Sequence, residues 1–202
     1  MDPVRAAAAD FVMLDDRREY LAPGAAVSLD KRWDDSLLSL GFDFRRRSYH
    51  DSKVRPFNSL RDGDEWSGRI GFEHAVTDWL GVSATAGYTR YDSDTRWEAY
   101  REWLVGVGIT LQPFESPFVD GQNVVFALSA AHLRSRYDSV DPVVDPDIKR
   151  KDKDWRFALT MNVPIFEDWS VVVQGGYNRR DSSLPNYEYK NWFTMSGIAW
   201  RF

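Results

Sequence analysis

The sequence has no cysteine among its 202 residues, so it can form neither a disulfide framework nor a cysteine-ligated zinc or iron–sulfur site. Lysine is scarce, since only six of the 26 Lys and Arg residues are lysines, and the net charge is −5. A chain with this charge binds nucleic-acid phosphates poorly, so no nucleic-acid partner is expected. No apolar run approaches the roughly 18 residues of a membrane-spanning helix. A helical membrane protein is thereby excluded, whereas a membrane β-barrel is not, because its strands alternate in polarity.

Aromatic residues, by contrast, are abundant. The chain contains nine Trp, nine Tyr and twelve Phe residues. Trp and Tyr are enriched where a protein crosses the boundary between water and lipid.

Residues 2–21 have a different pattern from the rest of the chain. Pro3 suits a first helical position, Ala6–Ala9 favour helix, and apolar residues recur at helical spacing until Ala22-Pro23-Gly24 ends the segment. The sequence predicts a short N-terminal helix here, with a strand around residues 10–14 as the alternative. We therefore divide the chain into an N-terminal helical segment, 1–23, and a barrel, 24–202.

From Gly24 onward the apolar residues recur with a period of two, which is typical of β-strands. Short turns at about 33–36, 77–79 and 166–169 alternate with long polar loops at about 48–64, 92–101, 138–154 and 180–188. A transmembrane barrel has short turns on one side and long loops on the other. The strands are expected at about 25–33, 37–47, 65–76, 80–91, 102–112, 124–137, 155–165, 169–178 and 189–202.

These strands predict an all-β fold, a closed antiparallel up-and-down transmembrane barrel. Antiparallel closure needs an even number of strands, so ten are preferred over nine, with eight as the alternative. A soluble β-barrel that buries its apolar face is the competing fold.

The two faces of the strands differ in composition. One face is small and polar, and we expect its charges to pair inside a narrow lumen, either as a salt-bridged plug or as a pore lining. The expected lumen-lining residues are Asp30, Asp43, Arg45, Arg69, Glu73, Glu102, Arg156 and Arg201.

The other face is aliphatic in mid-strand, with tryptophan at the strand ends. This pattern is typical of the aromatic girdles at the two membrane interfaces. The expected girdle residues are Trp33, Trp66, Trp79, Trp103, Trp155, Trp169 and Trp200.

The last strand ends in Trp200-Arg201-Phe202. Trp200 and Phe202 resemble the C-terminal assembly signal of bacterial outer-membrane proteins. The resemblance implies an outer-membrane location and recognition by the barrel assembly machinery.

A narrower resemblance covers about 55 residues at the end of the chain. Arg150-Lys151-Asp152-Lys153-Asp154-Trp155 and the stretch 180–190, with its R-x-D, Ser-rich loop and Tyr-x-Tyr, resemble the C-terminal barrel of the surface-lipoprotein assembly modifier family and of related barrels that follow tetratricopeptide repeats. Such barrels usually have more strands. The resemblance implies a role in moving lipoproteins or polymers across the outer membrane, with a periplasmic repeat domain or a secreted substrate as partner.

Catalytic signals are weak. His50, His74 and His132 have no spacing typical of a hydrolase, and the carboxylates of 138–154 follow no calcium-loop pattern. We expect no enzyme activity, no metal and no cofactor. The sequence predicts a porin-like pore or translocation-associated channel, in contact with outer-membrane lipids and lipopolysaccharide. The alternatives are a small plugged structural or adhesive barrel and a soluble ligand-binding barrel.

Overall fold

The computed structural model describes the backbone of residues 2–14, 17–51 and 58–200, and the side chains from Leu21 onward within these ranges. Within the described part, no helix has both the length and the apolar character needed to span a bilayer. The only helical turns described are two short 3-10 segments, η1 (Asn58–Arg61) and η2 (Pro185–Tyr187).

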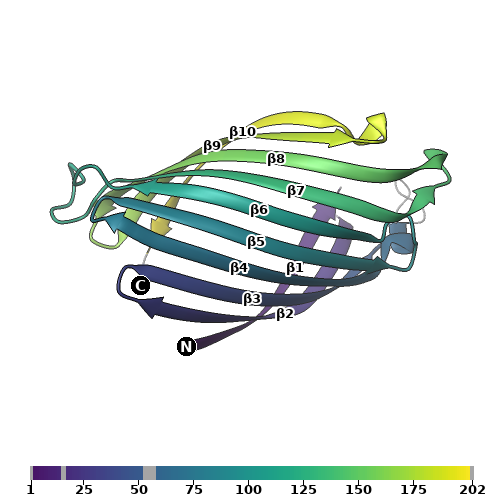
Figure 1. Ribbon diagram of the computed structural model, residues 1–202, viewed down its shortest axis with the longest axis horizontal. Helices are drawn as coiled ribbons and strands as arrows, with labels where there is room; N and C mark the ends of the chain where they lie inside the picture. Colours follow the sequence, from purple (N-terminus) through teal and green to yellow (C-terminus); the bar gives the residue numbers. More distant parts are fainter. Residues whose placement is uncertain (1, 15–16, 52–57, 201–202) are drawn as a thin grey trace.

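The described strands form one antiparallel sheet of ten strands in sequence order (Figure 1). The predicted all-β, antiparallel, up-and-down arrangement is thereby confirmed, whereas barrel closure stays a prediction. The strands are β1 (Asp2–Leu14), β2 (Arg17–Trp33), β3 (Ser36–Tyr49), β4 (Gly63–Thr77), β5 (Leu80–Ser93), β6 (Tyr100–Leu111), β7 (Val125–Asp141), β8 (Asp145–Phe166), β9 (Trp169–Ser182) and β10 (Tyr189–Trp200).

The predicted N-terminal helix is wrong. Residues 2–14 form β1, which pairs with β2, and β2 runs without a break through the expected boundary at residues 23 and 24. The helix preference of alanine amounts to less than about 1 kcal/mol per residue. A continuous ladder of interstrand pairing along β2 outweighs that preference.

The predicted polar loop at 138–154 is mostly strand. β7 and β8 continue as a hairpin whose turn is only Pro142–Val144. Two aspartates close this turn, since Asp141 accepts hydrogen bonds from the backbone N–H groups of Val143 and Val144, and Asp145 accepts from those of Asp147 and Ile148. Side chains that cap nearby backbone groups in this way favour turns.

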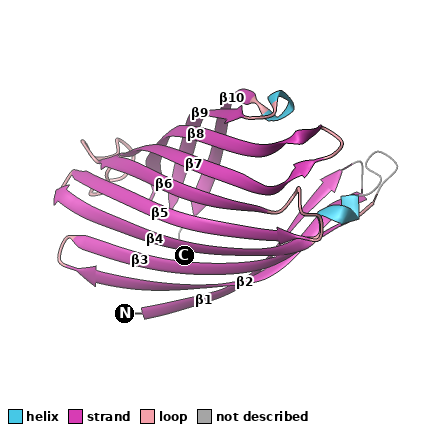
Figure 2. Ribbon diagram, turned by 45° about the vertical axis from the view of Figure 1, so that its right-hand side comes forward, coloured by secondary structure: helices cyan, strands magenta, loops and turns pink. Residues whose placement is uncertain are grey.

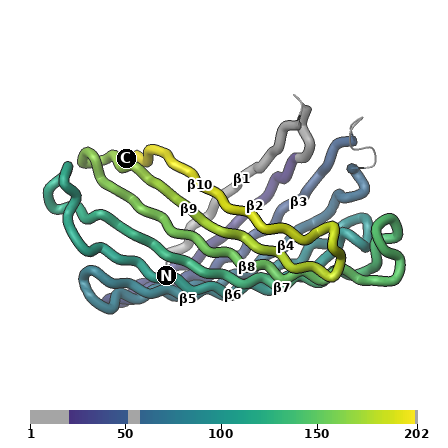
Figure 3. Tube along the Cα trace, turned by 90° about the horizontal axis from the view of Figure 1, so that it is seen from above, coloured from purple at the N-terminus to yellow at the C-terminus, as the bar shows by residue number. Residues whose placement is uncertain are grey.

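The sheet is strongly curled. Figure 1 shows β1 and β2 passing behind the middle strands, and Figure 2 shows β9 and β10 running behind them from the other edge. In Figure 3, β9 and β10 slope in the opposite direction to β2 and β3, on either side of β5–β7, as the walls of a curled sheet do. β1 and β10 are the two edges, and among the described residues no pairing joins them.

Strict register across the sheet separates an apolar face from a polar one. Neighbouring strands align Phe72, Ala84, Val107, Ala130 and Phe157 on one face. The adjacent row on the other face is Gly71, Thr85, Gly106, Ala131 and Arg156. This alternation confirms the assignment of faces from the sequence.

The apolar face is exposed. Val107 is 64% exposed, Leu159 48% and Ile70 46%, whereas the buried hydrophobic residues are few and lie mainly near the strand ends. The polar face is concave, since its small and charged residues line a hollow of about 610 Å³. The sheet therefore has its apolar side chains on the outside of the curl and its polar ones within it.

Candidate functional site

The candidate site is a network of charges and tyrosines on the concave face, where the strands approach the long loops. Strands β3 to β9 contribute to it, because in an up-and-down sheet every second connection lies at the same end. We call this set the rim network; it comprises Arg47, Tyr49, Arg61, Glu65, Tyr91, Glu98, Tyr100, Glu102, Ser135, Tyr137, Asp141, Arg150, Asp152, Asp154, Arg180, Ser182 and Tyr187.

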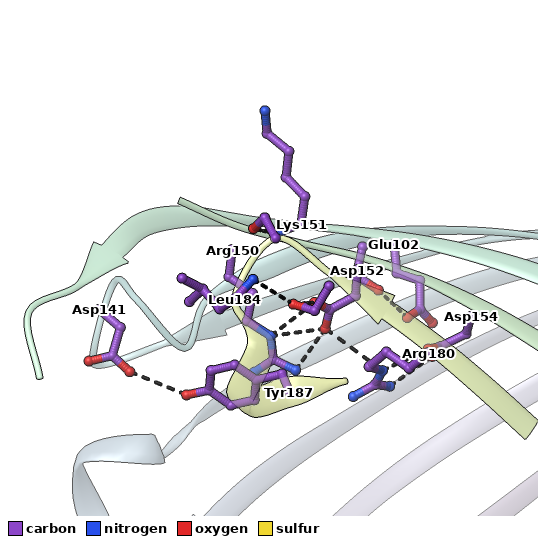
Figure 4. Close-up of polar contacts among 12 residues, drawn as sticks. Glu102, Asp141, Arg150, Lys151, Asp152, Asp154, Arg180, Leu184 and Tyr187 are labelled. Carbon is purple, nitrogen blue, oxygen red and sulfur yellow. Dashed lines mark hydrogen bonds and ion pairs between the residues drawn. The ribbon is translucent and has the colours of Figure 1, made fainter. Parts of the chain in front are cut away.

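Two buried carboxylates form its centre (Figure 4). Asp152 is 1% exposed and Asp154 2%. Arg150 Nη2 lies 2.7 Å from Asp152 Oδ2, and Ser182 Oγ donates to Asp152 Oδ1 at 2.7 Å. Arg180 holds Asp154 with two hydrogen bonds, from Nε at 2.6 Å and from Nη2 at 2.7 Å. Bidentate, charge-assisted hydrogen bonds are stronger than those between neutral groups. The negative charge of each carboxylate is therefore balanced by an arginine.

Tyrosine rings enclose the cation of this centre. The guanidinium of Arg150 lies 3.5 Å from the ring centroid of Tyr187 and 4.4 Å from that of Tyr137, which is cation–π geometry. The hydroxyl of Tyr187 donates to Asp141 Oδ2 at 3.3 Å. Leu184, 2% exposed, lies beside them in Figure 4. The connection between β9 and β10 is thereby fixed to the hairpin of β7 and β8.

A second cluster continues the network over β3 to β6. Arg47 forms an ion pair with Glu65, and Tyr100 donates to the same carboxylate at 3.3 Å. The hydroxyl of Tyr91 donates to the backbone carbonyl of Arg61. Arg61 Nε is 3.8 Å from Glu98 Oε1.

Glu98 and a chain of tyrosines connect the two clusters. Burial raises the pKa of the Glu98 carboxyl, while the nearby cations Arg61 and Arg150 oppose that shift. The rings of Tyr91, Tyr100 and Tyr137 follow one another at 5.5 Å between centroids. The network is therefore continuous from β3 to β9.

The predicted lumen residues divide into three groups. Arg45 Nε bonds Asp43 at 3.0 Å, Arg156 Nη2 lies 3.6 Å from Asp154, and Glu102 accepts from Ser135 Oγ at 2.6 Å. Asp30, Arg69 and Glu73 lie on the polar face nearer the short turns, and the described residues offer them no ion pair. Arg201 is outside the described residues. Asp43, Arg45, Arg69 and Glu73 line the hollow.

The two most buried carboxylates of the rim network, and the arginine that holds one of them, were missed by sequence reasoning. Asp152, Asp154 and Arg180 fell in or beside segments predicted as loops. The available signal was the period-two charge pattern Arg150, Asp152, Asp154 and Arg156, which places all four side chains on one face of a strand.

The predicted girdle residues form two sets, which lie on the apolar face except for Trp79 in the turn between β4 and β5. Trp33, Trp79, Trp169 and Trp200 lie at the short-turn end, whereas Trp66, Trp103 and Trp155 lie toward the long loops. Trp192, which the sequence analysis did not include, belongs with the second set, because it faces Tyr177 with 4.6 Å between ring centroids. All eight are at least 41% exposed. Of the predicted assembly signal, Trp200 ends β10, and Phe202 is outside the described residues.

The three histidines do not converge. His74 Nδ1 is 3.0 Å from Ser36 Oγ, and His132 Nδ1 is 3.1 Å from the backbone carbonyl of Asp154. His50 lies at the end of β3, where its carbonyl accepts from Asn58. Within the described ranges, no three metal-binding side chains come close enough to hold an ion.

No family model matches the chain, and neither does any curated protein. The geometry therefore carries the functional argument.

The rim network generates a stability prediction. Asp154→Ala leaves the half-buried Arg180 without its bidentate partner and should lower the free energy of unfolding by roughly 3 kcal/mol. The matched control is Asp181→Ala, because Asp181 bonds Arg179 at 2.9 Å but both side chains are nearly half exposed. Its loss should cost no more than about 1 kcal/mol. Urea unfolding in detergent, followed by tryptophan fluorescence, measures both; equal losses would contradict the structural role of the network.

Proposed function

We propose that this chain forms a β-barrel domain of the bacterial outer membrane, which acts as a narrow pore or translocation-associated channel. The observation that carries the proposal is the band of exposed aliphatic side chains on one face, bounded at both ends by exposed tryptophans. Water-soluble monomers rarely expose a continuous apolar patch larger than a few hundred Å². Here the band crosses the described strands from β3 to β10, and hydrocarbon is the environment in which such a face is stable.

The height of the apolar band along the membrane normal is also consistent with a bilayer. From Trp155 to Phe166, β8 is about 36 Å long at about 3.3 Å per residue, and a tilt of about 40° reduces this to about 28 Å across the membrane. The apolar band of outer-membrane barrels is about 25 Å tall.

A sheet in lipid cannot keep free edges, because unpaired backbone N–H and C=O groups are costly there. Ten up-and-down strands leave β1 and β10 antiparallel to each other. We therefore propose that these two edges pair and close the barrel.

The lining of the concave face is consistent with a narrow route for polar solutes. Toward the short turns, the concave face is lined by small residues and by the charges of Asp43, Arg69 and Glu73 around the hollow. Toward the long loops, the rim network crosses the same face and narrows it. A polar solute would pass the charged hollow and then meet this constriction.

A plugged barrel is the second candidate, and one observation favours it. Asp152 and Asp154 already have arginine partners, so the network needs no solute or ion to satisfy it. A self-neutralised network of this kind suits a structural closure of the lumen.

The translocation role also draws on the resemblance to surface-lipoprotein assembly modifier barrels. The two stretches that carry the resemblance, 150–155 and 180–190, contribute Arg150, Asp152, Asp154 and Arg180 to the rim network. A periplasmic repeat domain, a secreted substrate and the barrel assembly machinery are the partners this role requires.

A charge on the apolar face tests the membrane environment. Val107→Arg should reduce the fraction inserted into lipid vesicles, because arginine near the bilayer midplane costs about 2–4 kcal/mol. Ser129→Arg, on the polar face beside the same hollow, is the control and should insert normally. Protease protection and heat-modifiable gel migration measure insertion. Equal insertion of the two variants would refute the orientation of the sheet.

Closure is tested with paired cysteines, which the chain permits because it has none of its own. Ser196→Cys on β10 is combined in turn with a cysteine at each of positions 6 to 9 on β1. Pairing of the edges predicts an intramolecular disulfide in at least one pair, because bridged Cα atoms must lie within about 7 Å. Disulfide-linked dimers alone would show that a second copy covers the edge.

Conductance separates the pore from the plug. In planar bilayers the wild-type protein should give small, stable current steps, and Arg69→Glu should shift their selectivity toward cations. Lys190→Glu, on the exposed face of β10, is the control and should leave selectivity unchanged. A silent wild type, with current steps only after Arg150→Ser and Arg180→Ser are combined, would establish the plugged alternative instead.

A further inference from the structure

Five basic side chains gather on the apolar face, at and just beyond the level of the tryptophans of the long-loop end. Arg101 on β6 faces Arg136 on β7, which faces Lys151 on β8. Two residues nearer the aliphatic band along each strand, Trp103, Arg134 and Lys153 form the next row on this face. All five basic side chains are exposed, and in Figure 4 Lys151 projects away from the rim network. We call these five residues the basic patch.

No carboxylate of the described residues forms an ion pair with the basic patch. Two carboxylates beside the patch have other arginines as their ion-pair partners: Asp138 is bound by Arg90 at 2.6 Å, and Asp181, which faces Lys153, is bound by Arg179 at 2.9 Å. On the same face of the sheet, by contrast, Arg46, Arg90 and Arg179 each have an acidic partner. The basic patch is therefore a local excess of positive charge in a chain whose net charge is −5.

The geometry of the patch is unfavourable without a ligand. Like charges directly opposite each other on paired strands destabilise a sheet, and Arg101 lies opposite Arg136. Arg101, Arg134 and Arg136 instead surround a pocket of about 220 Å³, with Trp103 as its fourth wall. An anion in this pocket would relieve the repulsion and receive several charge-assisted hydrogen bonds.

The patch lies at the long-loop end, which faces the cell exterior in outer-membrane barrels, so the expected anion is a headgroup of the outer leaflet. The patch adjoins the tryptophans that mark the proposed interface, and the aliphatic band continues directly from Trp103 to Val105 and Val107 on the same strand. A lipid with acyl chains on this band would carry its headgroup to the level of the patch. Planar guanidinium groups match phosphate geometry.

We propose that the basic patch binds the phosphate groups of a multiply phosphorylated outer-leaflet lipid, the lipid A part of lipopolysaccharide. The proposal rests on the membrane function proposed above and assigns a lipid-binding site to it. Arg101, Arg134 and Arg136 hold a phosphate in the pocket, and Lys151 and Lys153 attract a second one. Trp103 packs against the sugar or upper acyl chain.

The test compares lipid binding by folded protein in neutral detergent. Lipopolysaccharide, enzymatically dephosphorylated lipopolysaccharide and inorganic phosphate are titrated separately by calorimetry. Wild-type protein should bind lipopolysaccharide, and the combined variant Arg134→Gln and Arg136→Gln should bind it about tenfold more weakly or worse, because two charge-assisted contacts are lost. The control combines Lys31→Gln and Lys190→Gln, exposed basic residues of the same face that lie away from the patch, and should change affinity less than twofold.

The same double variant is also compared with wild type for its stability against unfolding, first without lipid and then with it. In lipid-free detergent, the Arg134→Gln and Arg136→Gln variant should be at least as stable as wild type, because a like-charge contact is removed. Added lipopolysaccharide should stabilise wild type more than this variant.

The outcomes separate this site from the proposed function. Binding that survives dephosphorylation, equal binding by both double variants, or inorganic phosphate as tight as lipopolysaccharide would each overturn the site while leaving membrane insertion intact. Failure of the wild-type protein to insert into vesicles would instead overturn the membrane function on which the site rests.

Discussion

The structure depends on one constraint, the unbroken two-residue alternation that paired strands impose on their side chains. A slip of one residue in any pair would move a whole row of aliphatic side chains to the polar face. The register holds over all the described strand pairs from β2 to β10, with irregularities confined to a few positions near strand ends. The register therefore separates an apolar face from a polar one. This separation decides which residues can contact hydrocarbon and which can contact one another inside the curl.

The buried charges of the concave face and the basic patch of the convex face differ in their partners. On the concave face, buried carboxylates such as Asp152 and Asp154 are matched by arginines in bidentate or stacked geometry, which the planar guanidinium favours over an ammonium group. On the convex face, the basic patch has no such partners among the described residues. The concave environment accounts for part of the excess of arginine over lysine, and at the basic patch a phosphate would supply the missing negative charge.

Sequence reasoning found the strands and their faces because alternation is a local signal: Val105, Val107 and Ile109 are enough to orient β6. It failed where local and non-local effects compete. The alanines of 6–9 favour helix by themselves, and only the pairing with β2 makes them a strand. Asp152 and Arg180 read as loop residues because they are charged, yet they are far apart in the chain and become partners only when β8 and β9 pair. Trp192 was assigned no role, although its period placed it with the other tryptophans.

The contact between the convex face and hydrocarbon is the central claim, and nitroxide labels on single cysteines measure it most directly. Labels are placed one at a time along β6 from residue 103 to residue 110, with the protein reconstituted in vesicles, and collision rates with oxygen and with a water-soluble nickel complex are compared. The account predicts that oxygen collisions dominate at 105, 107 and 109, and nickel collisions at 106, 108 and 110. Nickel access at the odd positions, or no alternation at all, would contradict it.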